Sequence, residues 1–263
     1  MFNNEQFRDR VVIIIGAASG MGKQTALQFA ELGAKIVITD VNTRINDVFA
    51  EIKAQTSCEG LALVADVTKS QSCKDVVAAT LDAFGRIDAL VNCAGVIQVA
   101  NDIEVLPEEE WDRVLNVNLK GHFLMAKAAI PQFKKQKSGR IVLITSIWGR
   151  EGHRYFAAYC ASKGGLIMLT HSLAKEMVEH NVNVNSVAPG MINTELHQKS
   201  LRDQAIYEGT TYEEVRDKEW AKAPMGYAGD PSDIANGIIF LCSNESKYMT
   251  GATLDINGGI LMR

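Results

Sequence analysis

The chain has 263 residues, 47% hydrophobic and 22% charged, and carries a net charge of −4. This is a globular composition, and the length suits one α/β domain with a large sheet. The net charge is weakly acidic, so the sequence lacks the excess of basic residues that binding to nucleic acid or to an anionic membrane surface requires. Five scattered cysteines without a C-x-x-C pair argue against a disulfide framework and against a zinc site.

The N-terminus carries charged residues before its first apolar run, Val11 to Ile15, so no secretory signal is visible. That run is far too short to span a bilayer. The five histidines show no metal-ligand spacing. We therefore expect a cytoplasmic protein with no metal, no nucleic-acid partner and no membrane partner.

Strand-like and helix-like segments alternate along the chain. Val11 to Ile15 is a continuous β-branched run, as a sheet buried on both faces requires. A glycine-rich turn, a helix over 23–32 and a second strand over 35–40 follow, which together form a βαβ unit. Further strands are predicted over 61–65, 89–92, 140–146, 182–187 and 253–256, and further helices over 46–56, 72–84, 108–135, 155–180 and 230–242.

Seven strands separated by helices predict an α/β fold: a Rossmann-type doubly wound parallel sheet with helices on both faces. No linker or internal repeat interrupts the pattern, so residues 1–263 are predicted to form a single domain. One connection, residues 191–229, is far longer than usual. We expect it to be a substrate-binding lid inserted within the domain and to contain one or two short helices.

The first turn carries Gly16, Gly20 and Gly22, spaced G-x-x-x-G-x-G, with Ser19 and Met21 between them. Glycines at this point leave no side chain to block the approach of a pyrophosphate to the N-terminus of a helix. Because the turn follows a buried strand and precedes a helix, these five residues are predicted to bind a dinucleotide.

Asp40 ends the second strand, where an acid accepts hydrogen bonds from the adenosine ribose hydroxyls. Its carboxylate would repel a 2′-phosphate, and no Arg or Lys occupies the glycine loop to offset that repulsion. Arg44 is close in sequence, and the simpler interpretation is a solvated residue. The predicted cofactor is therefore NAD(H) rather than NADP(H).

Short or small residues end the third and fourth strands, on the edge where such sheets bind ligands. They suit an adenine and ribose groove, although each taken singly also fits an ordinary strand-to-helix turn. The predicted groove residues are Asp66, Val67, Asn92, Ala94 and Gly95.

Tyr159 and Lys163 lie four residues apart in a predicted helix, so they share one face. Tyrosine has a pKa of about 10, and an adjacent cation favours the phenolate and lowers that pKa. The pair is therefore predicted to be a proton-transfer group. Ser146 ends the strand before it, and the surrounding sequence is not the G-x-S-x-G elbow that a hydrolase nucleophile requires.

In order and spacing, these motifs make the chain resemble the classical short-chain dehydrogenase/reductase family over essentially its whole length. Two positions depart from the family pattern: Ile15 replaces a hydroxyl residue and Cys93 a frequent asparagine, and neither touches the catalytic groups. The matching segments are Gly16-Ala17-Ala18-Ser19-Gly20-Met21-Gly22, Asn92-Cys93-Ala94-Gly95, Asn118-Leu119-Lys120-Gly121, Ser146, Tyr159-x-x-x-Lys163 and Pro189-Gly190.

The resemblance implies a role for each matched residue. Tyr159 would exchange a proton with the substrate oxygen, and Ser146 would hold and polarise that oxygen. Lys163 would lower the pKa of Tyr159 and bind the nicotinamide ribose, so both also count as cofactor residues. Asn118 would fix a water that links Lys163 to solvent. The positions implied for the carboxamide side of the cofactor are Pro189, Gly190, Ile192 and Thr194.

The resemblance also implies a homotetramer, paired through the long helices and the C-terminal strand. An apolar stripe in the helix predicted over 155–180 would either take part in that contact or face the protein's own sheet. The stripe consists of Leu166, Leu169, Leu173 and Met177.

The substrate pocket is expected to be lined by residues 96–100, residues 148–155 and the lid. Its tentative substrate residues, beside Ser146 and Tyr159, are polar or aromatic, unlike the lining for a steroid or long acyl chain. Family members that act on sugars and polyols are similar in this respect. We therefore expect an NAD-dependent polyol dehydrogenase. The tentative residues are Trp148, Arg150, His153 and Arg154, of which the two arginines would clamp an anionic group or lie at the surface.

Two alternatives are considered, one within the enzymes and one in another class of protein. A 3-oxoacyl-(acyl-carrier-protein) reductase using NADPH would usually carry basic residues where this chain has Ser19 and Asp40. A cofactor-binding protein without turnover would have lost catalytic residues, whereas Ser146, Tyr159 and Lys163 are all present, as is Asn118.

Overall fold

A computed structural model describes residues 6–262. Within this range seven parallel strands form one sheet in the order β3-β2-β1-β4-β5-β6-β7. The chain builds one half of the sheet outward from β1 and then crosses to build the other half from β4, so the predicted doubly wound fold is confirmed. The strands are β1 Val11–Ile15, β2 Lys35–Asp40, β3 Gly60–Val64, β4 Ala89–Asn92, β5 Gly139–Ile144, β6 Val182–Pro189 and β7 Thr253–Ile256.

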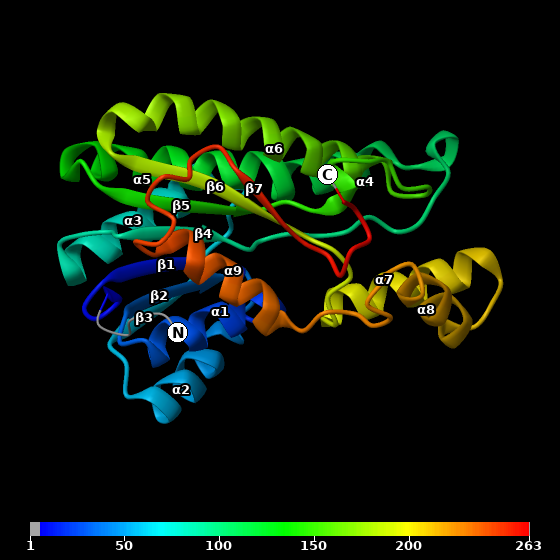
Figure 1. Ribbon diagram of the computed structural model, residues 1–263, viewed down its shortest axis with the longest axis horizontal. Helices are drawn as coiled ribbons and strands as arrows, with labels where there is room; N and C mark the ends of the chain where they lie inside the picture. The colour runs from blue at the N-terminus through cyan, green and yellow to red at the C-terminus, as the bar shows by residue number, and fades with distance from the viewer. Residues whose placement is uncertain (1–5, 263) are drawn as a thin grey trace.

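Helices cover both faces of this sheet (Figure 1). Because side chains alternate along a strand, Val12 and Ile14 of β1 enter one core, while Ile13 and Ile15 enter the other. The first core packs against α1 (Gly20–Glu31), α2 (Ile45–Thr56) and α9 (Pro231–Cys242). The second packs against α3 (Ser70–Phe84), α5 (Gly121–Gln136) and α6 (Ala157–Met177).

The helix predicted over 108–135 is interrupted around Asn118, a predicted site residue. It consists of α4 (Glu108–Leu115), a π-helical turn η3 (Asn116–Lys120) and α5. The π turn places Asn118 in the interior, where its side chain is fully buried. The predicted helix over 155–180 likewise ends in a short 3₁₀ turn, η5 (Val178–His180), that follows α6.

The long connection over 191–229 contains two helices, as predicted: α7 (Glu195–Glu208) and α8 (Tyr212–Trp220). They extend beyond the sheet at the right of Figure 1 and hold each other through a small cluster of Leu201, Ala205 and Val215. Short 3₁₀ turns, η2 (Ile103–Val105) and η4 (Ile147–Gly149), lie in the loops after β4 and β5.

The apolar stripe of α6 faces the protein's own sheet. Leu166, Leu173 and Met177 are buried in the second core, and Leu169 packs against it. Among residues 6–262 no helix combines the length and apolarity that crossing a membrane requires. In the same part of the chain no three His, Cys, Asp or Glu side chains gather closely enough to hold a metal ion.

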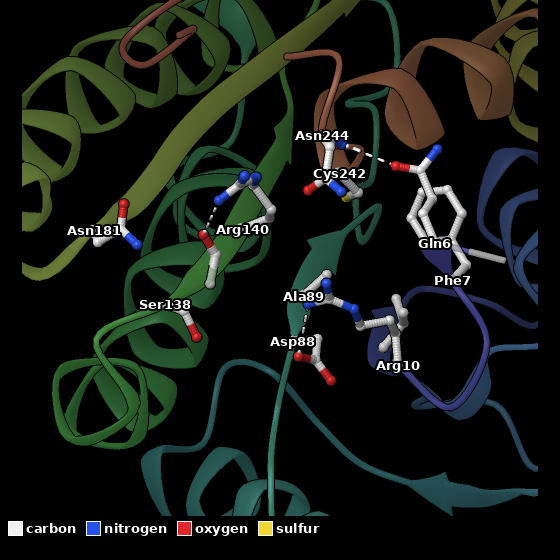
Figure 2. Close-up of a pocket in the computed structure, with 12 residues that line it drawn as sticks. Gln6, Phe7, Arg10, Asp88, Ala89, Ser138, Arg140, Asn181, Cys242 and Asn244 are labelled. Carbon is white, nitrogen blue, oxygen red and sulfur yellow. Dashed lines mark hydrogen bonds and ion pairs between the residues drawn. The ribbon is translucent and has the colours of Figure 1, made fainter. Parts of the chain in front are cut away.

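At the amino ends of β1 and β4 a cavity of about 210 Å³ opens beside Asp88 (Figure 2). Asp88 is 7% exposed and joins two chain segments, residues 10–11 and residues 86–88. Its carboxylate accepts hydrogen bonds from Val11 N at 2.9 Å, from Arg10 Nη1 at 3.2 Å and from Arg86 Nε at 2.9 Å. The carboxylate therefore fixes β1 against β4 at the edge of the sheet opposite the predicted site.

Replacing Asp88 with Ala tests this contact. Arg10 and Arg86 are half exposed and regain water, but the Val11 N–H stays buried without a partner. We expect a loss of about 2 kcal/mol in the free energy of unfolding. Urea denaturation measures it, with the exposed Asp82→Ala as the matched control. Equal stability of the two variants would show that the contact is not stabilising.

Candidate active site

A groove of about 570 Å³ runs along the carboxyl ends of β1, β2 and β4, at the switch point of the sheet. Most of the predicted cofactor residues line it. Asn92 lies behind it, fully buried, and accepts a hydrogen bond from Ala94 N at 3.1 Å. The predicted residues that line the groove are Gly16, Ser19, Gly20, Met21, Gly22, Asp40, Asp66, Val67, Ala94, Gly95 and Thr194.

The groove fits a dinucleotide. A Cβ at Gly22 would lie 2.1 Å from Gly16 O, and Gly16 itself has φ +76°, so the turn tolerates only glycine at these positions. The turn leads into the N-terminus of α1, which carries no acidic residue in its first turn and no side-chain cap from Ser19. Free N–H groups at a helix N-terminus suit a pyrophosphate.

Asp40 is held in a fixed orientation at the far end of the groove. Its carboxylate accepts hydrogen bonds from Ala18 N at 3.1 Å and from Asn42 N at 2.9 Å. Arg44 pairs with Glu195 of α7, with 3.5 Å between Nη1 and Oε1. Arg44, which follows Asp40 by four residues, is therefore already paired with another acid.

A second cavity, of about 110 Å³, adjoins the groove and holds the predicted catalytic residues Ser146, Tyr159 and Lys163. Lys163 Nζ lies 5.6 Å from the centre of the Tyr159 ring and donates to Ile144 O at 2.7 Å. Ser146 Oγ accepts from Trp148 N at 3.2 Å, which turns the serine toward the tyrosine. Ser146, from the segment after β5, thus lies beside Tyr159 and Lys163 of α6.

The pKa of Tyr159 differs from the sequence-based expectation. Burial raises it to about 12, and a hydrogen bond with Ser146 opposes the rise only in part. Burial also lowers the pKa of Lys163 to about 8. In the protein alone, desolvation therefore outweighs the cation four residues away, and the tyrosine is a phenol at neutral pH.

The side chain of Asn118 forms hydrogen bonds with the loop after β4. Its Oδ1 accepts from Val96 N and its Nδ2 donates to Val96 O, both at 2.8 Å. The same Nδ2 donates to Ser162 Oγ on α6 at 3.1 Å. The side chain thus links the cofactor loop to the helix that carries Tyr159 and Lys163.

Two buried residues near the site were given no role by the sequence, although Gln98 lies in the segment 96–100 that was expected to line the substrate pocket. Gln98 is 1% exposed and holds the start of α6, because its Oε1 accepts from Tyr159 N and its Nε2 donates to Tyr155 O. His122, fully buried on α5, donates from Nε2 to Ala94 O at 2.9 Å. Neither residue belongs to a recognisable sequence motif, because each forms its hydrogen bond with a residue that is distant in the sequence.

His122 is predicted to make the fold sensitive to acid. Burial lowers its pKa to about 3 from an ordinary value of 6.5, so the stabilisation is complete above pH 6.5 and is lost as the pH falls toward 3. We expect this group to remove about 2 kcal/mol of unfolding free energy between pH 7 and pH 5. His122→Gln keeps a donor for Ala94 O and removes the titration. Urea denaturation of both proteins at the two pH values should show a smaller loss in the variant, whereas equal losses would contradict the assignment.

The tentative substrate residues separate into two groups. Trp148 lines the cavity and stacks on His153 with ring centres 4.0 Å apart. Arg150 donates to Asp255 and to Thr253 O of β7, at 3.0 and 3.2 Å, and so fastens η4 to the edge strand. Arg154 is an exposed side chain, 3.7 Å from Asp102.

The two arginines and His153 therefore do not line the cavity, and the expected anion clamp does not form there. Arg150 and Arg154 are held by acids outside the cavity, Asp255 and Asp102, while the His153 ring stacks on the cavity residue Trp148 without lining the cavity itself. Opposite charges therefore position the arginines, and the indole positions the histidine ring.

The walls of the cavity are more apolar than expected. Ile97, Ile147, Trp148 and Met191 line it, and α7 adds further side chains that sequence reasoning did not assign. The α7 residues reach both spaces: Glu195 and Lys199 line the groove, His197 and Ser200 line the cavity, and Leu196 lines both.

Comparison with known proteins agrees with this arrangement. A family model described as Enoyl-(Acyl carrier protein) reductase matches residues 16–261. The 3-oxoacyl-(acyl-carrier-protein) reductase FabG of Thermotoga maritima is 37% identical, over 96% of this chain and 98% of its own. The 2,5-dichloro-2,5-cyclohexadiene-1,4-diol dehydrogenase LinX of Sphingobium indicum is 38% identical over 95% of both chains.

Among solved structures, NAD⁺-bound xylitol dehydrogenase matches with a TM-score of 0.93 at 31% identity, over 97% of this chain and 100% of its own. The similarity therefore extends over the groove, the catalytic cavity and the segment after β6 alike. The chain is an oxidoreductase, and it belongs to the classical short-chain dehydrogenase/reductase family.

Proposed function

We propose that this protein is an NAD(H)-dependent oxidoreductase that interconverts a secondary alcohol and a ketone on a small polyhydroxylated substrate. The observation that carries the proposal is the continuity of the site. The groove that ends at Asp40 and the cavity that holds Tyr159 share five lining residues: Met21, Cys93, Gly95, Thr194 and Leu196. A nicotinamide cofactor bound there supplies hydride exchange with the carbinol carbon.

Tyr159 would carry the proton. Since its pKa is about 12, the phenol predominates at neutral pH and can donate to a carbonyl oxygen, whereas alcohol oxidation needs the phenolate and gains from alkaline pH. Ser146 would hold the same oxygen. Lys163, with a pKa of about 8, is mostly protonated at neutral pH and would stabilise the phenolate. Asn118 would position a water that relays the proton to solvent.

The cofactor preference rests on Asp40. Its carboxylate would accept hydrogen bonds from the ribose hydroxyls of NAD(H) and would repel the 2′-phosphate of NADP(H). Arg44, four residues after Asp40 in the sequence, is paired with Glu195. On the nicotinamide side, Pro189, Gly190, Ile192 and Thr194 line the cavity and would receive the carboxamide.

The substrate would be compact, with an apolar face and separated polar groups. A cavity of about 110 Å³ with aliphatic and indole walls favours a short diol or ring diol over an extended, highly charged sugar. Two similar proteins are named for small hydroxylated substrates, xylitol and a cyclohexadiene diol, of which the second is a ring diol. Residues 191–229 would act as the lid, because α7 lines both spaces.

The second candidate is an NADPH-dependent 3-oxoacyl-(acyl-carrier-protein) reductase. The apolar cavity walls and the similarity to FabG favour it. Asp40 and the absence of a basic residue in the glycine turn disfavour it. The two candidates differ in both cofactor and substrate.

Initial rates distinguish them. NAD⁺ and NADP⁺ are compared at alkaline pH with cyclic diols, polyols and sugars, and NADPH-dependent reduction of a 3-oxoacyl thioester is measured in parallel. Turnover of a diol with NAD⁺ supports the first candidate. Thioester reduction with NADPH, without diol oxidation, would replace it with the second.

We also propose the homotetramer that the family resemblance implies. Phe123 on α5 and Met168 on α6 are 42% and 56% exposed and offer apolar surface on the long helices. Light scattering would give four times the 28.7 kDa chain mass.

A further inference from the structure

We infer that the cavity contains a second oxygen-binding subsite, made by the Nδ1–H of His197, that selects substrates with a second hydroxyl or carbonyl oxygen. This inference rests on the proposed function, since it specifies which alcohols the same cavity accepts. It concerns the part of the cavity lined by α7, which is a different element from those that carry Ser146 and Tyr159.

Trp220 determines which nitrogen of His197 carries the proton. Trp220 Nε1 lies 3.3 Å from His197 Nε2. An indole N–H only donates, so Nε2 must be the acceptor, and the hydrogen of the neutral imidazole must sit on Nδ1. Burial lowers the pKa of His197 to about 4, so the ring is neutral at physiological pH.

The Nδ1–H is a donor without a partner among the residues that the structure describes, and its ring lines the cavity. The neighbouring lid hydroxyls are engaged within α7. Ser200 Oγ donates to His197 O at 2.8 Å, and Thr194 Oγ1 accepts from His197 N at 3.2 Å. Much of the remaining lining of the cavity is apolar and includes Ile97 and Leu196. An acceptor oxygen on the substrate would therefore satisfy the imidazole.

The packing of α8 holds Trp220 in place, and Trp220 in turn keeps the proton of His197 on Nδ1. Glu219, which precedes Trp220, is 5% exposed and is held by Lys222 at 2.6 Å. Glu219 Oε2 also lies 4.0 Å from His153 Nε2, and the His153 ring stacks on the cavity residue Trp148. Docking of α8 against the catalytic loop thus places the indole that sets the tautomer of His197.

Two substitutions at His197 separate the two ring nitrogens. His197→Asn keeps an amide N–H near the position of Nδ1, whereas His197→Gln keeps an acceptor near Nε2 and loses the Nδ1 donor. The probes are cyclohexane-1,2-diol and cyclohexanol, which differ by one hydroxyl. His180→Gln, in η5 after α6, is the matched control.

We expect the wild type, His197→Asn and the control to prefer the diol by about tenfold in kcat/KM, and His197→Gln to lose that preference. An equal preference in the wild type and in His197→Gln would overturn the inference. Trp220→Phe, which keeps an aromatic side chain and removes the N–H, should raise KM for the diol more than it lowers kcat.

A binding measurement that needs no turnover tests the His197 subsite separately from the proposed dehydrogenase reaction. In protein labelled with ¹⁵N-histidine and saturated with NAD⁺, the His197 signals should report a protonated Nδ1, and cyclohexane-1,2-diol should shift the Nδ1 signal more than cyclohexanol does. A protonated Nε2, or equal shifts, would refute the subsite. If the expected shifts occur but neither alcohol is oxidised, the subsite stands and the proposed reaction fails.

Discussion

The variant Tyr159→Phe should lose at least about 10³-fold in kcat for alcohol oxidation, because it removes the group that exchanges the substrate proton. That loss corresponds to about 4 kcal/mol of transition-state stabilisation. The side chain is confined between Trp148, 5.9 Å away between ring centres, and Lys163, so no water replaces the phenol in the same geometry.

Measuring cofactor affinity shows whether the lower kcat of Tyr159→Phe comes from the missing proton donor or from a disrupted binding site. NADH affinity of Tyr159→Phe should fall by at most about tenfold, as for the loss of one neutral hydrogen bond. Tyr248→Phe makes the same chemical change at a fully exposed position and should retain wild-type kcat. Tyr159→Phe with kcat near that of the wild type would contradict the assignment of the proton donor.

The second large effect is expected at Asp40. Asp40→Asn keeps an oxygen that can accept from Ala18 N and removes the negative charge. We expect NADPH to bind at least about tenfold more tightly and NADH about tenfold less tightly, so the preference changes by about 100-fold. Fluorescence titration of both cofactors measures the ratio.

Asp47→Ala is the control for the change in net charge, because Asp47 is exposed on the first turn of α2. It should leave the NADH-to-NADPH ratio as in the wild type. If Asp40→Asn also leaves that ratio unchanged, another residue selects the cofactor. Arg44 would be examined next, since its ion pair with Glu195 links the adenosine end of the groove to α7.

The sheet could be predicted from the sequence because its signals are local. Val11–Ile15, Lys35–Asp40 and Ala89–Asn92 were predicted with the observed bounds, since each is a short apolar run between a turn and a polar residue. The glycine turn and the Tyr159–Lys163 spacing are local as well, so their positions at the carboxyl edge follow from the fold.

The features that were missed depend on contacts between distant segments. Arg150 has the sequence character of a substrate residue, but Asp255 on β7 holds it outside the cavity. Gln98 acts on Tyr159 through a contact that no sequence spacing indicates. The pKa of Tyr159 was expected to fall, and it rises because burial, which depends on the whole fold, outweighs the nearby lysine.

The central claim is tested most directly by following one hydride. Wild-type protein is incubated with NAD⁺ and a diol that carries deuterium on the carbinol carbon, and mass spectrometry measures ketone and labelled cofactor together. We predict one deuterated NADH for each ketone formed, and neither product with Tyr159→Phe. Failure to form NADH from any diol or polyol, while NADPH reduces a 3-oxoacyl thioester, would contradict the account.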